Sequence, residues 1–307
     1  MTSPNNLAAL IYLKDKVHKW KNIALLISVF ALLLLFKLLF GERLQGGVIE
    51  EDSIASIKID TEISEDDYRS KVLKELAEKD SVKAVIVNIN SPGGGIVGSE
   101  ILYNDLRAIA QKKPVGVLMG TVAASGGYMA AIASDYLVAY NGTLTGSIGV
   151  LMELPNVSGL AEKVGVKWQT YKSSPLKGAP SPFEKPNQLV DHVMQESIND
   201  SYKFFSDLVK MRRGDKLNKK MLGAIFDGRA FTGRQALEAG LIDKIGNQED
   251  ILKYFESQKI DTKKLPIHEV EIVQEEKKFL DKFLNILPFF DGVKNVNHGS
   301  QIKAILP

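Results

Sequence analysis

Strands and helices alternate along residues 53–140, and this pattern constrains the fold more than any other feature of the chain. Runs of apolar, often β-branched residues predict strands at 53–60, 82–90, 114–119 and 136–140. Helical spacing of apolar residues predicts helices between them at 66–79 and 97–111, and a run of small residues predicts another at 126–133. Strands and helices that alternate with short connections build an α/β domain, which is the fold class that we predict.

Two of these strands lead into glycine-rich turns, at 93–95 and 126–127. In α/β domains, ligands bind where the carboxyl ends of strands meet the N-termini of helices. Glycine-rich turns also bind phosphates, but the Gly-Lys-Ser/Thr ending of a P-loop is absent from the sequence. We therefore expect a ligand site at these turns and no nucleotide cofactor.

The pattern is less regular after residue 150. The sequence predicts helices at 156–164 and 187–212, an extended stretch at 167–171, a turn with a threonine-led helix start at 227–236, and a strand or turn at 240–246. From residue 263 onward the pattern weakens, and we expect a partly mobile C-terminal extension over 263–307.

The N-terminal segment differs from the rest of the chain. Residues 23–40 are apolar except for Lys37, and this length spans a hydrocarbon layer of about 30 Å. Lysines precede the segment and carboxylates follow it, which predicts a cytoplasmic N-terminus at 1–22, a transmembrane helix at 23–40 and a linker at 41–53. The alternatives are a cleaved signal peptide and the core helix of a soluble protein, and the segment's length and charge asymmetry weigh against both.

Composition excludes several classes of function. The net charge of +2 is too small to indicate nucleic-acid binding. The absence of cysteine excludes disulfide bonds and a thiolate nucleophile. The four histidines, His18, His192, His268 and His298, lack the spacing of metal ligands. We expect neither a metal nor another cofactor.

Ser125 stands between the strand at 114–119 and a helix of small residues. At this junction its hydroxyl lies near free backbone N–H groups and the positive end of the helix dipole, which stabilise a developing oxyanion. Gly126 and Gly127 allow a substrate backbone to come close. Ser125 is therefore a candidate nucleophile, and the alternative is that it only caps the helix.

A serine nucleophile needs a neighbouring base. His192 is the one histidine within the α/β region, but its neighbours predict a solvent-facing or packing position on a helix. Lys177 lies among apolar loop residues, and an amine that loses hydration favours the neutral form that accepts a proton. The sequence favours Lys177 over His192, with Ser147 as a candidate partner for the amine.

Five spaced motifs, together with a late matching stretch, resemble the signal peptide peptidase A family of membrane-anchored serine proteases, in its short, single-repeat form. They lie in order at 90–95, 124–128, 145–150, 177–179 and 228–233, and the late stretch covers 236–243. The resemblance runs from about residue 54 to residue 246, and the residues before 23 and after 263 carry no matching motif.

The resemblance implies the fold, the site and the substrates. The fold would be of the ClpP/crotonase type, built from stacked ββα units. Ser125 would be the nucleophile, Lys177 the general base, Ser147 the residue that holds the lysine, and the amides of Gly94 and Gly126 the oxyanion hole. The substrates would be remnant signal peptides in the membrane.

The assembly follows from the same resemblance, and the location follows from it together with the charge asymmetry around 23–40. The family's short form assembles an octamer in which neighbouring subunits share the serine and the lysine. The chain would be a single-pass protein of the bacterial plasma membrane, with its protease domain at 54–262 outside the cytoplasm.

Two alternatives remain. A crotonase-type acyl-CoA enzyme uses the same fold and similar glycine-rich oxyanion loops, but the membrane anchor and the absence of a carboxylate near either loop weigh against it. A non-catalytic membrane scaffold on a protease fold has no need of Ser125, Ser147 and Lys177 together.

Overall fold

A computed structural model describes residues 14, 16–18, 20–25, 27–30, 51–272 and 303–304. The chain divides into two units, Met1–Val48 and Ile49–Pro307. In the first unit the described residues are helical. Among the residues that the structure describes, no helix combines the length and the apolar character needed to cross a membrane. Residues 31–40 of the predicted anchor and 273–302 of the predicted C-terminal extension lie outside the described residues, so both stay predictions.

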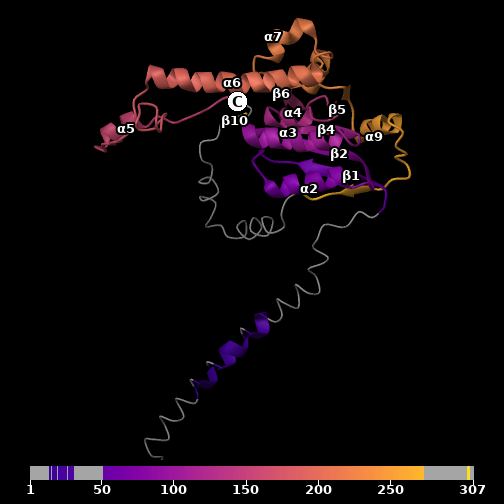
Figure 1. Ribbon diagram of the computed structural model, residues 1–307, viewed down its shortest axis with the longest axis horizontal. Coiled ribbons are helices and arrows are strands. Elements are labelled where there is room, and N and C mark those ends of the chain that lie inside the picture. Colours follow the sequence, from indigo (N-terminus) through magenta and orange to yellow (C-terminus); the bar gives the residue numbers. More distant parts are fainter. Residues whose placement is uncertain are drawn as a thin grey trace, which may run out of the picture. The chain divides into compact units, whose positions relative to one another are not determined.

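The second unit is built on an eight-stranded sheet (Figure 1). Its strands are β1 (Ser53–Ile59), β2 (Val82–Ser91), β4 (Val115–Ala124), β5 (Tyr136–Ala139), β6 (Leu144–Gly146), β7 (Ala230–Thr232), β8 (Lys244–Ile245) and β9 (Ile267–Glu269). Their order is β7-β6-β4-β2-β1-β9, and β5 pairs with both β4 and β8. All of these pairs are parallel except β6 with β7. A separate antiparallel pair joins β3 (Gly94–Gly95) to β10 (Lys303–Ala304).

Helices cover both faces of the sheet. One face packs against α2 (Asp67–Glu78), α3 (Ile96–Ala110), α4 (Gly126–Ala131) and the C-terminal part of α6 (Gln188–Arg213). The other face packs against α9 (Gln248–Ser257). The remaining helices are α5 (Ser158–Lys163), η2 (Lys219–Met221), α7 (Leu222–Ile225) and α8 (Gly233–Ala239). This layered arrangement confirms the predicted α/β class.

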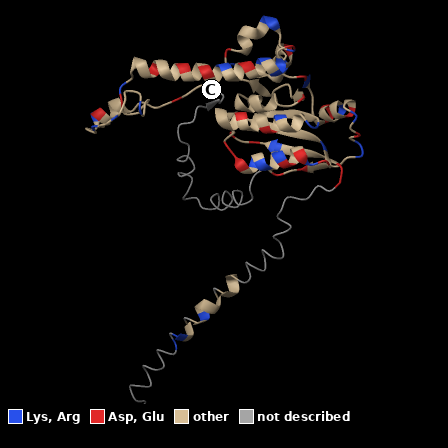
Figure 2. Cartoon of the chain, viewed as in Figure 1, with Lys and Arg blue, Asp and Glu red and all other residues tan. Residues whose placement is uncertain are grey.

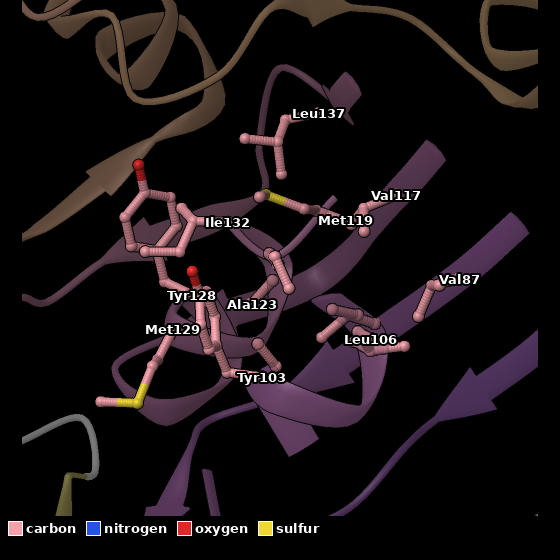
Figure 3. Close-up of a cluster of buried hydrophobic side chains, with 14 of the residues drawn as sticks. Val87, Tyr103, Leu106, Val117, Met119, Ala123, Tyr128, Met129, Ile132 and Leu137 are labelled. Atoms are coloured by element: carbon pink, nitrogen blue, oxygen red, sulfur yellow. The ribbon is translucent and has the colours of Figure 1, made fainter. Parts of the chain in front are cut away.

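The buried strands explain the layers. Ile54 and Ile86 face α9, whereas their neighbours Ala55 and Val87 face α2 and α3, since side chains alternate along a strand. Because both faces are buried, β1 and β2 are almost continuously apolar. Figure 3 shows part of the larger cluster, in which side chains of the strands meet those of α3 and α4.

Most predicted elements are present within one or two residues of their expected bounds. β4 is longer than predicted because it continues past Met119 and pairs with β6 through Ala124. No strand forms at 167–171, and neither α9 nor β9 was predicted. The start of α9 carries a capping box between Asn247 and Asp250, a local signal that identifies a helix N-terminus.

An arm extends from the domain. It comprises residues 151–204, all of them described, and none of them is buried. The arm includes α5 and the first part of α6, a helix of 26 residues that is about 39 Å long at 1.5 Å per residue. Figure 2 shows that both signs of charge are distributed along α6.

Candidate active site

Ser125 occupies a tight turn between β4 and α4. Its backbone angles, φ 54° and ψ −121°, lie where a residue with a side chain is strained. The turn is held on both sides, because the Ser125 N–H donates to the Gly146 carbonyl at 2.8 Å and the Ser125 carbonyl accepts from the Met129 N–H at 2.9 Å. Ser125 is 1% exposed, and within the described part of the chain its Oγ has no hydrogen-bond partner. A strained turn thus holds a buried hydroxyl that the described chain leaves unpaired.

Two backbone amides from different elements meet beside this serine. A Cβ atom on Gly126 would lie 2.1 Å from Ser99 Oγ and 3.2 Å from the Gly94 nitrogen. A side chain at position 126 would therefore crowd Ser99, and the Gly94 amide lies next to the first residue of α4. The structure brings together Ser125, Gly126 and Gly94 as expected.

The turn at 93–95 is paired on its other side by residues 61–65, between β1 and α2. The Ile63 N–H donates to the Gly93 carbonyl at 2.8 Å, and the Gly95 N–H donates to the Ile63 carbonyl at 3.0 Å. Glycines 93, 95 and 98 have the spacing of a dinucleotide-binding loop. Packing offers a different reason for glycine here, because Gly94 and Gly98 are each in direct contact with the backbone of 63–65. That close approach accounts for glycine at 94 and 98.

An extended peptide segment lies along the same turn. β10 pairs antiparallel with β3, with Lys303 opposite Gly95 and Ala304 opposite Gly94. The edge beside the Gly94 amide therefore accepts a strand through main-chain hydrogen bonds, which is a common mode of peptide recognition.

Ser147 lies in the turn after β6. It has φ 50° and is buried, and its N–H donates to the Arg229 carbonyl at 3.0 Å. The preceding residue, Gly146, accepts the hydrogen bond from Ser125, so the turns that carry Ser125 and Ser147 are joined directly.

The two candidate bases are not bonded to Ser125 within this chain. Lys177 is exposed on the arm, where its backbone N–H donates to the Ser174 carbonyl at 3.1 Å. His192 is exposed on α6 and lies 3.3 Å from Glu196. Since Ser125 Oγ has no partner in the described chain, no Ser125–Lys177 hydrogen bond forms within one copy.

Cations hold the opposite end of α4. Arg212 donates to the Ile132 and Ser134 carbonyls at 2.9 and 3.0 Å, and Arg107 donates to the Ala133 carbonyl at 3.0 Å. Burial lowers the pKa of Arg212, and Arg107 adds to this shift. Tyr128 of α4 donates to the Leu241 carbonyl at 2.8 Å, and burial raises the pKa of its hydroxyl. Sequence reasoning missed these contacts, because their partners lie far apart in the chain.

Several of the known proteins that match this chain are described as proteases. A putative protease of Methanocaldococcus jannaschii is 37% identical over 189 residues, which is 62% of this chain and 60% of the relative. A putative signal peptide peptidase SppA of Enterococcus faecium is 39% identical over 188 residues, which is 61% of this chain and 54% of the relative. This chain thus spans less than two thirds of the length of these two relatives.

One solved structure with a related description is the 1510-N membrane-bound stomatin-specific protease. It has a TM-score of 0.44 and 16% sequence identity, and the match covers 72% of this chain and 98% of that one. Residues 107–260, half of the chain, match the pattern of peptidase family S49. The chain therefore belongs to peptidase family S49, as its resemblance to the signal peptide peptidase A family predicts.

Proposed function

We propose that this chain is a membrane-anchored serine endopeptidase that degrades remnant signal peptides and other short hydrophobic peptides. The observation that carries the proposal is the buried Oγ of Ser125, which lies on a strained turn beside the Gly94 and Gly126 backbone amides and has no partner in the described chain. Backbone strain and a buried hydroxyl without a partner both lower the stability of a fold, and features of this kind are concentrated at functional sites.

The reaction assigns one role to each residue. Ser125 Oγ attacks the scissile carbonyl carbon, and the Lys177 amine takes the hydroxyl proton. The N–H groups of Gly94 and Gly126 stabilise the oxyanion that forms. The protonated lysine then gives its proton to the leaving amine, and a water molecule activated by the same lysine hydrolyses the acyl-enzyme. Ser147 accepts a hydrogen bond from the lysine and orients it.

Lys177 comes from a second copy of the chain in this proposal. Lys177 and the arm around it are exposed, and the arm carries large apolar side chains in contact with solvent, including Tyr171 at 87% exposure, Trp168 and Leu160. An exposed apolar arm is suited to cover a neighbouring subunit. We propose a homo-oligomer, an octamer as in the family's short form, in which each arm delivers Lys177 to the neighbour's Ser125.

The edge at Gly94–Gly95 is the proposed peptide-binding strand. The pairing of β10 with β3 supports this assignment, because it places an extended segment antiparallel to Gly94 and Gly95. A substrate paired in the same way is held by its main chain, and its side chains alternate between two sides. This mode suits short peptides of varied sequence.

The proposed location is the bacterial plasma membrane. The apolar segment at 23–40 anchors the chain, residues 1–22 remain in the cytoplasm, and a linker at 41–53 leads to the catalytic domain at 54–262 and its extension at 263–307. The layered α/β domain would be of the ClpP/crotonase type. A protease held at the membrane surface is close to hydrophobic peptides that leave the bilayer.

Labelling with a fluorophosphonate tests the assignment. The full-length chain in detergent is expected to form one adduct, which peptide mapping places on Ser125, and Ser125→Ala abolishes both labelling and peptide cleavage. Lys177→Ala is expected to lower kcat by at least about 100-fold. Lys185→Ala is the matched control, because Lys185 is another exposed lysine of the arm, paired with Glu162. An adduct on a different serine, or near-normal turnover by Lys177→Ala, refutes the dyad.

A further inference from the structure

Residues 61–65 fix the position of the Gly94 amide. Ile63 uses both of its main-chain groups on the glycine turn, with the Gly93 carbonyl on one side and the Gly95 N–H on the other. Ser91 Oγ adds a third bond, to the Thr61 carbonyl at 2.6 Å. Since successive amides of a strand point to opposite sides, pairing of Gly95 with Ile63 directs the Gly94 amide away from residues 61–65.

The contact between the two segments is backbone against backbone. A Cβ on Gly94 would lie 2.0 Å from the Ile63 carbonyl oxygen, and one on Gly98 would lie 2.6 Å from the Ser64 carbonyl carbon. At both glycines the nearest atoms are backbone atoms, which cannot move aside by rotation of a side chain. A shift of residues 63–65 is therefore transmitted directly to Gly94.

Arg69, in the first turn of α2, holds residues 63–65 by a hydrogen bond to their backbone. Its Nη2 donates to the Ser64 carbonyl at 2.7 Å, and the residue is only 7% exposed. Its own backbone is fixed, because the N-cap residue Asp66 accepts a hydrogen bond from the Arg69 N–H at 3.0 Å. Arg69 thus connects the capped start of α2 to residues 63–65.

The guanidinium is costly to bury here. Arg69 Nε and Asp105 Oδ2 are both buried, and neither has a hydrogen-bond partner within the described part of the chain. Burial lowers the pKa of Arg69, while the Asp66 and Asp105 carboxylates oppose this shift. An incompletely paired buried charge destabilises a fold, so a role beyond packing is needed to account for it.

We infer that Arg69 is a positioning residue that sets the oxyanion-binding amide of Gly94 by holding Ser64 and Ile63. The expected effect on kcat rests on the proposed function. The structural coupling of Arg69 to Gly94 does not depend on it. The oxyanion hole acts in the transition state, so its misplacement lowers kcat and leaves KM nearly unchanged.

The kinetic test compares two cations at opposite ends of α2, namely Arg69 in its first turn and Lys113, which contacts its C-terminal end. Arg69→Met is expected to lower kcat by about 10- to 100-fold with KM changed less than about twofold. Arg69→Lys keeps a donor for the Ser64 carbonyl and is expected to recover part of the loss. The control is Lys113→Met, because Lys113 Nζ donates to the Leu76 and Lys79 carbonyls at the opposite end of α2. The control should lose stability but keep its kcat.

A second variant protects the test against misfolding. Arg69→Met combined with Asp105→Asn removes both buried charges, and it should fold while keeping the low kcat. A kcat in this double variant equal to that of Lys113→Met overturns the inference.

Hydrogen exchange separates this inference from the proposed function. In Arg69→Met the amides of the peptide that spans 93–96 should exchange faster than in the native chain, and in Lys113→Met they should not. If the native chain neither cleaves peptides nor reacts with a phosphonate, the proposed function fails, while the exchange result still decides the role of Arg69. Unchanged exchange at 93–96 in Arg69→Met refutes the coupling.

Discussion

Ser125 combines two features that each cost stability. Its φ of 54° is unfavourable for any residue with a Cβ atom. Within the described residues its buried Oγ has no partner, whereas water hydrogen-bonds this hydroxyl in the unfolded chain. Ser134, at the other end of α4, is also buried, but its Oγ donates to the Ala131 carbonyl at 2.8 Å. The two serines therefore differ in whether the chain itself satisfies the hydroxyl.

The comparison gives a prediction about stability. In a single, unassembled copy, Ser125→Ala should raise the free energy of unfolding by about 1 kcal/mol, because it removes a buried hydroxyl that has no partner within the described chain. In the assembled protein the same substitution abolishes cleavage. Ser134→Ala should lower the free energy of unfolding by a similar amount and leave cleavage intact. Urea unfolding of the three chains measures the differences, and a loss of stability in Ser125→Ala would show that Oγ has a partner in the folded protein.

The sequence predicts those parts of the site whose residues are close together in the chain. Ser125 and Gly126 are adjacent in sequence, and the strand before them and the small residues after them identify the turn. The contact of Ser99 with Gly126, and that of Ile63 with the turn at 93–95, join positions that no local pattern links. The apolar neighbours of Lys177 in the sequence favour it as the base, but a single chain does not bring it to Ser125.

At the level of elements, α6 is anchored at its C-terminal end by a charged cluster. Arg213 donates to both oxygens of Asp243, at 2.9 and 3.0 Å, and to the Gly240 carbonyl. Lys216 Nζ donates to the same carboxylate at 2.7 Å, and so does the Leu137 N–H at 2.9 Å. Burial raises the pKa of Asp243, but Arg213 and Lys216 outweigh it and hold this pKa below its ordinary value.

The sign of this shift predicts how stability depends on pH. A carboxylate whose pKa is lower in the folded chain stabilises the fold above the unfolded pKa of about 4 and loses that contribution as the pH falls through the folded value. Asp243→Asn should therefore lower the free energy of unfolding by about 3 kcal/mol at pH 7 and by much less near pH 2.

A matched control exists in an exposed pair. Asp261 contacts Lys264 at 2.7 Å on the surface, so Asp261→Asn should change little at either pH. Equal effects of the two substitutions at pH 7 would contradict the role assigned to Asp243.

The sequence predicts helices and strands well where the apolar periodicity is clear. It fails for strands whose extent is set by pairing with another strand. The helix at 187–212 and the strands at 53–60 and 82–90 follow from periodicity alone. The continuation of β4 to Ala124 depends on β6, and β9 is a three-residue edge strand held by β1. Neither pairing can be inferred from the residues of the strand itself.

At the scale of the whole molecule, the arm at 151–204 is the part of the described chain that its own fold explains least. An ordinary helix of 26 residues buries an apolar stripe along its length, but the buried residues of α6 all lie between Phe205 and Arg213. Trp168 stacks on Phe183 at 4.3 Å between ring centroids, so the arm has some structure of its own. Its stability is expected to depend on contacts with a second copy.

Mixing two inactive chains tests a dyad shared between copies. Ser125→Ala and Lys177→Ala homo-oligomers should each be inactive, since every site lacks either the nucleophile or the base. In particles co-expressed from equal amounts of both chains, random mixing gives about one quarter of the interfaces an intact serine from one copy and an intact lysine from the other. Peptide cleavage should therefore return to about one quarter of the native value, with the phosphonate adduct confined to Lys177→Ala chains. The Ser125→Ala chain mixed equally with Lys185→Ala should recover about half of the native activity, since both chains keep Lys177 and only the Lys185→Ala chain supplies Ser125. A co-expressed pair of Ser125→Ala and Lys177→Ala that stays inactive while forming mixed particles would mean that Ser125 and Lys177 must come from the same chain.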